Sequence, residues 1–177
     1  MAVTSGSRCQ YEYMLGGGPP AIVEVGEKYD STGWDKGTWL IKDSSGHVTK
    51  HATGNITGGV IGFAMQSMSS TADGSKKVPM LLVTPNTVFS AVCAHATTAS
   101  AALQTANLFA TYMLTSSATV CPSTNVHVID LGTASTAAGA YIIAPKDATG
   151  TLYGRAYFIL GGRTYSTDSP WNDNTST

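Results

Sequence analysis

The hydrophobic positions of this chain fall into short runs separated by glycine-rich and polar segments, which is the pattern of a β protein. The densest part is the stretch 58–93, where three apolar runs of strand length follow one another. These runs cover residues 60–65, 78–83 and 88–92. Asp73-Gly74 lies at the tip of the first connection, and the second is the tight turn Thr84-Pro85-Asn86. We therefore expect three consecutive antiparallel strands, with a bulge or close backbone approach where Gly58, Gly59 and Gly62 remove side chains at the start of the first strand.

Further strands are predicted on both sides of this stretch. They cover residues 10–15, 21–25, a hairpin of 38–42 with 47–51, and then 108–114, 126–131, 140–144 and 152–160. The segment 94–107 is rich in alanine and threonine and predicts a short helix over 101–108 or a long ordered loop. The predicted fold is mainly β: a small antiparallel β-barrel or sandwich with an Ala/Thr-rich loop or short helix and extended N- and C-terminal arms.

Three regions are predicted from the distribution of glycine, proline and polar residues. Residues 1–20 form an N-terminal arm that ends in a Gly-Pro hinge, because three glycines followed by two prolines suit neither a helix nor a central strand. Residues 21–160 form the β-barrel or sandwich domain. Residues 161–177 form a polar C-terminal tail.

Composition narrows the classes of function. The net charge of -1 and a charged fraction of 12% leave no basic stripe for a phosphate backbone, so direct nucleic-acid binding is not expected. The three cysteines match no zinc or redox motif, and free thiols in a reducing cytosol are expected. No secretion signal and no membrane span are predicted. We expect a soluble protein made inside a cell.

Few residues are candidates for chemistry. His47 and His51 would lie roughly 13 Å apart along a strand, so we expect solvated side chains rather than a metal site. Cys93 and His95 could share a strand face, which keeps a thiol enzyme as an alternative. The acidic residues are scattered. We expect no enzyme activity, no catalytic residues, no cofactor and no metal.

Several segments in a fixed order carry a resemblance to a known family. They are Gly37-Thr-Trp-Leu-Ile-Lys, Ser45-Gly-His-Val-Thr, Gly59-Val-Ile-Gly-Phe-Ala, Val78-Pro-Met-Leu-Leu-Val, Pro85-Asn-Thr-Val-Phe-Ser-Ala and Gly154-Arg-Ala-Tyr-Phe-Ile. This order, over about residues 25–160, resembles the capsid decoration (cement) proteins of tailed bacteriophages. The chain departs from the pattern at Lys36, where an acidic residue is common, and in the segment 94–107.

The resemblance implies a structural protein of the virion. It would bind the outer surface of an assembled capsid and stabilise it by bridging capsid subunits. The implied partner is the major capsid protein, and the implied state is a homo-oligomer, with a trimer favoured and a dimer next. The implied location is the capsid exterior, after synthesis in the host cytoplasm, with no direct nucleic-acid or membrane contact.

The N-terminal arm is the predicted contact with the capsid or a neighbour, because its apolar area is not needed by the barrel. The predicted contact residues are Arg8, Tyr11, Tyr13, Met14, Gly16, Gly17, Gly18, Pro19 and Pro20. The alternative is that this segment supplies an edge strand to its own sheet.

A second function remains open, namely a head fibre or a glycan-binding β module on the virion or cell surface. Sugar binding requires exposed aromatic rings beside polar side chains. The candidates are Trp34-Asp35 and Trp171-Asn172-Asp173. For Trp34 and Trp39, packing in the core is the favoured interpretation.

Overall fold

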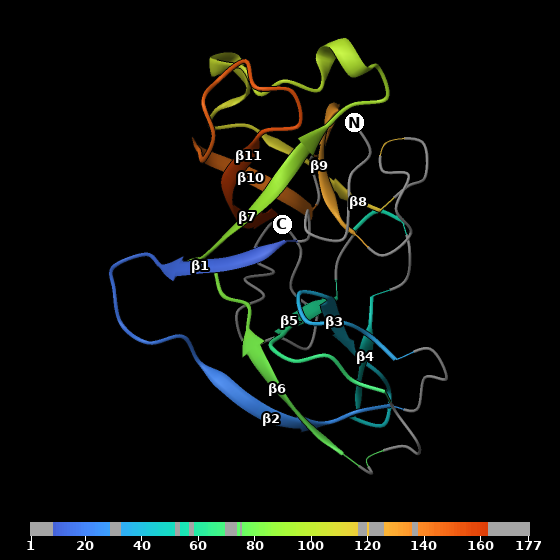
Figure 1. Ribbon diagram of the computed structural model, residues 1–177. Coiled ribbons are helices and arrows are strands. Elements are labelled where there is room, and N and C mark those ends of the chain that lie inside the picture. Colours follow the sequence, from blue (N-terminus) through green and yellow to red (C-terminus); the bar gives the residue numbers. More distant parts are fainter. Residues whose placement is uncertain are drawn as a thin grey trace, which may run out of the picture.

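The computed structural model describes residues 9–28, 33–51, 54–56, 59–69, 74, 76–116, 120, 126–135 and 138–162. Within these ranges the chain forms two β-sheets and two short 3-10 turns, and the prediction of a mainly β fold with a barrel is confirmed (Figure 1). The strands are β1 (Gln10–Met14), β2 (Ile22–Gly26), β3 (Trp39–Lys42), β4 (Val48–Lys50), β5 (Val60–Ala64), β6 (Lys77–Leu82), β7 (Thr87–Ala94), β8 (Thr111–Thr115), β9 (Val128–Ala134), β10 (Ala138–Pro145) and β11 (Arg155–Gly162).

The first sheet closes into a barrel around β7. The order β7-β11-β10-β8-β9 returns to β7, because the end of β7 pairs in parallel with β9 at Cys93 and Ile129. β11 pairs with one side of β7, and β1 pairs with the other side along the first half of β7. In this pairing Tyr11 lies opposite Phe89. Every side chain of β7 is buried. A strand covered on both faces reads as a nearly continuous apolar run, which explains its sequence.

The second sheet has the order β2-β6-β5-β3-β4, and β3 and β4 form the predicted hairpin. This sheet is curled, because the residues that follow β2 at one edge contact β4 at the other edge. The N–H of Lys28 donates to the carbonyl oxygen of Val48 over 2.7 Å. The predicted irregularity is also present: the register shifts between Leu40 and Ile41, opposite β5, and a Cβ on Gly62 would overlap the side chain of Met80.

One local prediction is wrong. β5 and β6 pair as expected, but β7 does not pair with β6 and belongs to the other sheet. The Thr84-Pro85-Asn86 connection therefore carries the chain from one sheet to the other instead of closing a hairpin. For the segment after β7, the predicted alternative of a long ordered loop is confirmed, and the short helix over 101–108 is not formed. This loop contains the 3-10 turns η2 (Thr98–Ser100) and η3 (Thr105–Asn107), consistent with its many threonines, which disfavour a helix.

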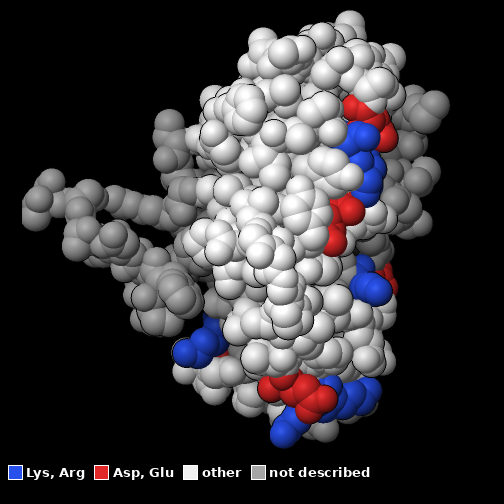
Figure 2. Space-filling model, turned by 90° about the vertical axis from the view of Figure 1, so that its left-hand side faces the viewer, with Lys and Arg blue, Asp and Glu red and all other residues white. Residues whose placement is uncertain are grey.

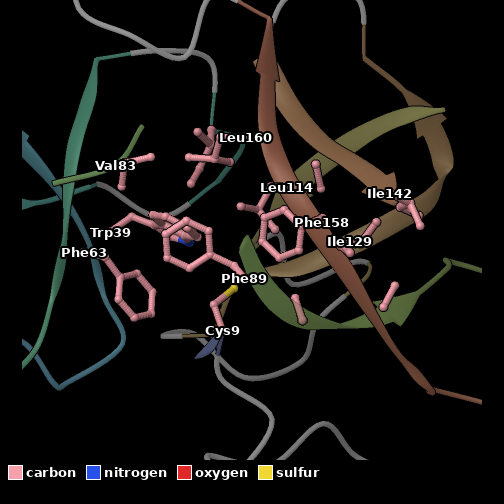
Figure 3. Close-up of a cluster of buried hydrophobic side chains, with 14 of the residues drawn as sticks. Cys9, Trp39, Phe63, Val83, Phe89, Leu114, Ile129, Ile142, Phe158 and Leu160 are labelled. Carbon is pink, nitrogen blue, oxygen red and sulfur yellow. The ribbon is translucent and has the colours of Figure 1, made fainter. Parts of the chain in front are cut away.

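The two sheets share one hydrophobic core, shown in Figure 3. Trp39 and Phe63 of the second sheet pack against Phe89 of β7, with ring centroids 4.8 and 5.1 Å from that of Phe89. Phe89 in turn contacts Phe158 of β11 at 5.9 Å. Burial alternates along β11: Ala156, Phe158 and Leu160 are buried in this core, while the residues between them are not fully buried. Both predicted core tryptophans are buried.

Candidate functional site

The predicted contact segment forms an edge strand and a turn. Residues 10–14 are β1, so the alternative of an edge strand in the protein's own sheet is confirmed. Tyr11 points inward, and its ring meets that of Phe89 edge-on at 6.4 Å. Met14 is half-buried. Arg8, together with the rest of 1–8 and with 163–177 of the predicted tail, lies outside the described residues.

Tyr13 is the aromatic residue of this segment that faces solvent. The register of β1 against β7 shifts between Tyr11 and Tyr13. This bulge leaves 44% of Tyr13 exposed, with its ring edge-on to Tyr157 at 6.1 Å. Leu15 follows with 41% exposure, and Ile22 at the start of β2 is 50% exposed. Three of the largest exposed apolar side chains in the described chain therefore lie within ten residues of one another.

The glycines and prolines between β1 and β2 form an exposed turn. Gly16, Gly17 and Gly18 have φ angles of 83°, 76° and 96°, a left-handed conformation that only glycine adopts repeatedly. Pro19 is exposed and Pro20 is partly exposed. The turn joins the edge strand of one sheet to the edge strand of the other. We call the surface formed by Tyr13, Leu15 and residues 16–20 the β1–β2 side.

The β1–β2 side carries little charge. Figure 1 places β1, β2 and their connection along one flank of the molecule, and Figure 2 looks onto this flank. Most of the surface in that view is uncharged, and the charged side chains gather along one margin and at the lower end. Between Tyr13 and Gly26 the sequence contains one charged residue, Glu24. An apolar and uncharged surface of this kind is typical of protein contacts.

A polar cluster fixes β1 to the barrel. Glu12 accepts hydrogen bonds from the Lys146 ammonium and the Ser90 hydroxyl, each over 2.5 Å. Arg155 donates to the Ser90 carbonyl oxygen over 2.9 Å. Burial alone would raise the pKa of Glu12, but the bonds from Lys146 and Ser90 outweigh it and hold the pKa below its usual value. The sequence did not predict this cluster, because its members are separated by up to 134 positions and meet only through sheet pairing.

The thiol at Cys93 is placed unfavourably for catalysis. Its side chain belongs to the shared core, and burial raises its pKa to about 12. His95 lies beyond the end of β7, where its Nδ1 accepts a hydrogen bond from the N–H of Thr97 over 2.8 Å. Burial therefore keeps the Cys93 thiol protonated at neutral pH.

We expect iodoacetamide to label Cys93 very slowly in the folded protein. A pKa of about 12 leaves a thiolate fraction at neutral pH roughly a thousandfold below that of an ordinary thiol. Mass spectrometry of the peptide that contains Cys93, after timed labelling, measures the rate. The same peptide labelled in denaturant is the control. Equal rates in the folded and denatured protein would contradict the buried placement.

The prediction that His47 and His51 are solvated is wrong, because both side chains are partly buried. His51 is not fully solvated: its ring meets that of His127 edge-on at 5.9 Å. His47 is also partly buried, with its Nδ1 enclosed. His127 is buried, and the thiol of Cys9 donates to its carbonyl oxygen over 3.3 Å. Burial, assisted by the nearby His51, lowers the pKa of His127 to about 4.

Neither candidate for glycan binding forms an exposed aromatic site in the described part of the chain. Trp34 is buried and packs with Met68 and neighbours in the second sheet, so its ring cannot stack on a sugar. Trp171-Asn172-Asp173 lies outside the described residues.

No protein-family model matches the chain, and searches of the curated proteins and of the solved structures gave no match. In the described part of the chain, no three histidine, cysteine or acidic side chains are grouped so as to hold a metal ion. The same residues include no helix long and apolar enough to cross a membrane.

Proposed function

We propose that this protein is a capsid decoration protein, a structural protein of a phage virion that binds the outer surface of an assembled capsid. One observation carries the proposal. Tyr13 and Leu15 are exposed on either side of the Met14 position, next to the glycine-proline turn, on an uncharged flank of a mainly β protein. This is a surface suited to contact with another protein, and the resemblance to decoration proteins supplies the partner.

The barrel leaves apolar surface of Tyr13 and Leu15 unburied. Tyr11 serves the protein's own core, whereas Tyr13 and Leu15 keep more than two-fifths of their surface in water. Burying such side chains in a contact contributes roughly 25 cal/mol for each Å² removed from water. Tyr13 also offers a hydroxyl group, which suits a contact that is apolar in its centre and wet at its rim.

The partner in this proposal is the major capsid protein, and binding bridges neighbouring capsid subunits. The protein acts as a homo-oligomer, a trimer or a dimer, on the capsid exterior. It stabilises the shell without catalysing a reaction and without touching the packaged DNA, which agrees with its low charge. The anchored β1 presents a preorganised contact, which lowers the entropic cost of binding.

Co-sedimentation with expanded, mature capsids tests the proposal, with unexpanded procapsids as the control shell. We expect saturable pelleting with expanded capsids at a fixed ratio to the capsid subunit. The double variant Tyr13→Ser, Leu15→Ser should pellet at least about tenfold more weakly, since both apolar contacts are lost. Leu152→Ser is the matched control, because Leu152 is 52% exposed on a different loop.

Two outcomes would overturn parts of this account. If the wild-type chain stays in the supernatant with both shells, the decoration function is wrong. If the wild type pellets and the double variant pellets equally well, decoration stands but the β1–β2 side is not the contact.

A further inference from the structure

The second sheet has an open edge at β2. Among the described strands, β2 is the end strand of its sheet and pairs with β6. The carbonyl oxygen of Ala21 accepts a hydrogen bond from the N–H of Leu82, and the N–H of Glu27 donates to the carbonyl oxygen of Lys76. Odd-numbered residues along this segment therefore direct their backbone N–H and C=O groups toward β6. Because backbone groups alternate along a strand, Ile22 and Glu24 direct their N–H and C=O groups away from the sheet. Among the described residues no strand pairs with that side of β2.

The open edge is short because the sheet curls closed beyond it. Lys28 bonds to Val48 of β4, and a Cβ placed on Gly26 would lie 3.3 Å from the ring of His47. The groups free to accept another strand are therefore those of Ile22 and Glu24, with Ala21 and Val25 as neighbours. The sequence IVEVG fits this edge, with Val23 and Val25 packed toward the second core cluster and Ile22 half exposed.

This edge lacks the features that usually prevent strands from pairing between molecules. Edge strands are commonly protected by lysine, proline or a bulge. β1 has such a bulge, between Tyr11 and Tyr13. β2 has regular pairing with β6 throughout, contains no lysine or proline, and carries a single charge at Glu24. A regular, mostly apolar edge of this kind accepts an added strand.

We propose that β2 pairs antiparallel with β2 of a second copy of this chain, forming a two-fold symmetric dimer with one sheet continuous across the interface. The register is centred on Val23. In that register Ile22 lies opposite Glu24 of the second copy, and Val23 lies opposite its own equivalent. The alternative register centred on Glu24 sets two carboxylates against each other and requires Gly26, where the sheet is closed by β4.

A second copy fits this edge better than an unrelated strand for two reasons. An antiparallel pairing about a two-fold axis matches each N–H of Ile22 and Glu24 with a C=O of the other copy, so the edge complements itself. The register centred on Val23 also keeps the Glu24 carboxylates of the two copies apart, because each lies opposite Ile22 of the other copy. The inference does not depend on capsid binding, and of the two oligomers that the resemblance implies it selects the dimer.

Light scattering coupled to size-exclusion chromatography tests the dimer with the purified full chain over a range of concentrations. We expect the mass of a dimer for the wild type. Ile22→Glu places a carboxylate opposite Glu24 of the second copy at both ends of the pairing, and Glu24→Pro removes an outward N–H without breaking a bond to β6. Each variant should weaken self-association by roughly tenfold or more. Leu152→Glu is the matched control, because its side chain has almost the same exposure as Ile22, and it should remain dimeric because Leu152 lies outside β2.

Thermal unfolding of each variant shows whether it is folded, and Ile22→Glu alone tests the interface if Glu24→Pro does not fold. A wild-type chain that is monomeric at every concentration would overturn the proposal. So would a trimer, or a dimer that both substitutions leave unchanged. These results are independent of the co-sedimentation, so a failure of this interface is distinguishable from a failure of the decoration function.

Discussion

Replacing Phe89 with alanine is expected to lower the free energy of unfolding by about 4 kcal/mol, because large buried aromatic residues cost about 3–5 kcal/mol when truncated. Phe89 is fully buried and contacts rings from both sheets, including Trp39, Phe63 and Phe158. The cavity would therefore open at the junction of the barrel and the second sheet. Neighbouring strands of both sheets would have to move to fill it.

Urea unfolding followed by fluorescence and by circular dichroism measures this loss. Phe109→Ala is the matched control, because Phe109 is 68% exposed. It should change the stability by less than about 0.5 kcal/mol. A loss below about 1 kcal/mol for Phe89→Ala would show that the shared core does not hold the sheets together.

Acidification from pH 6.5 toward 4 is expected to destabilise the fold by roughly 3 kcal/mol through His127. Burial lowers the folded-state pKa of His127 from 6.5 to about 4, so the fold favours the neutral ring. The contribution is complete above pH 6.5, where the ring is neutral in both states. It is lost progressively as the pH falls through the window between the two values, because the unfolded chain takes up a proton first.

Urea unfolding at a series of pH values measures this dependence, and His127→Gln is the comparison. The variant should lose most of the slope between pH 6.5 and 4. It should keep the decline at lower pH that arises from Glu12 and Asp43, whose pKa values lie below their usual range. Identical slopes for the variant and the wild type over pH 6.5 to 4 would contradict the assignment to His127.

The strands were predictable from the sequence because each is marked by an apolar run and a turn signal. The β3–β4 hairpin and the existence of β11 follow from these local patterns. The placement of β7 does not. A tight turn after β6 predicts a hairpin, but β7 is apolar on both faces and is most stable inside the barrel, where both faces are covered. Tertiary packing decides between these two arrangements.

The candidate site was predictable in position but not in detail. The glycine-proline segment and its flanking tyrosines indicated an unusual surface. The bulge at β1, which turns Tyr13 outward and Tyr11 inward, depends on the register with β7. Likewise, the bonds of Glu12 to Ser90 and Lys146 join residues that only the folded barrel brings together. The open edge of β2 depends on the curl of the second sheet, which no local pattern indicates.

The measurement that tests the central claim most directly is the temperature at which expanded, DNA-filled capsids release their DNA, followed by the access of a dye. A protein that binds the intact shell more tightly than the disrupted one must raise this temperature. We expect the release temperature to rise with added protein and to level off at a fixed ratio to the capsid subunit. An unchanged release temperature at saturating protein would contradict a role in stabilising the capsid.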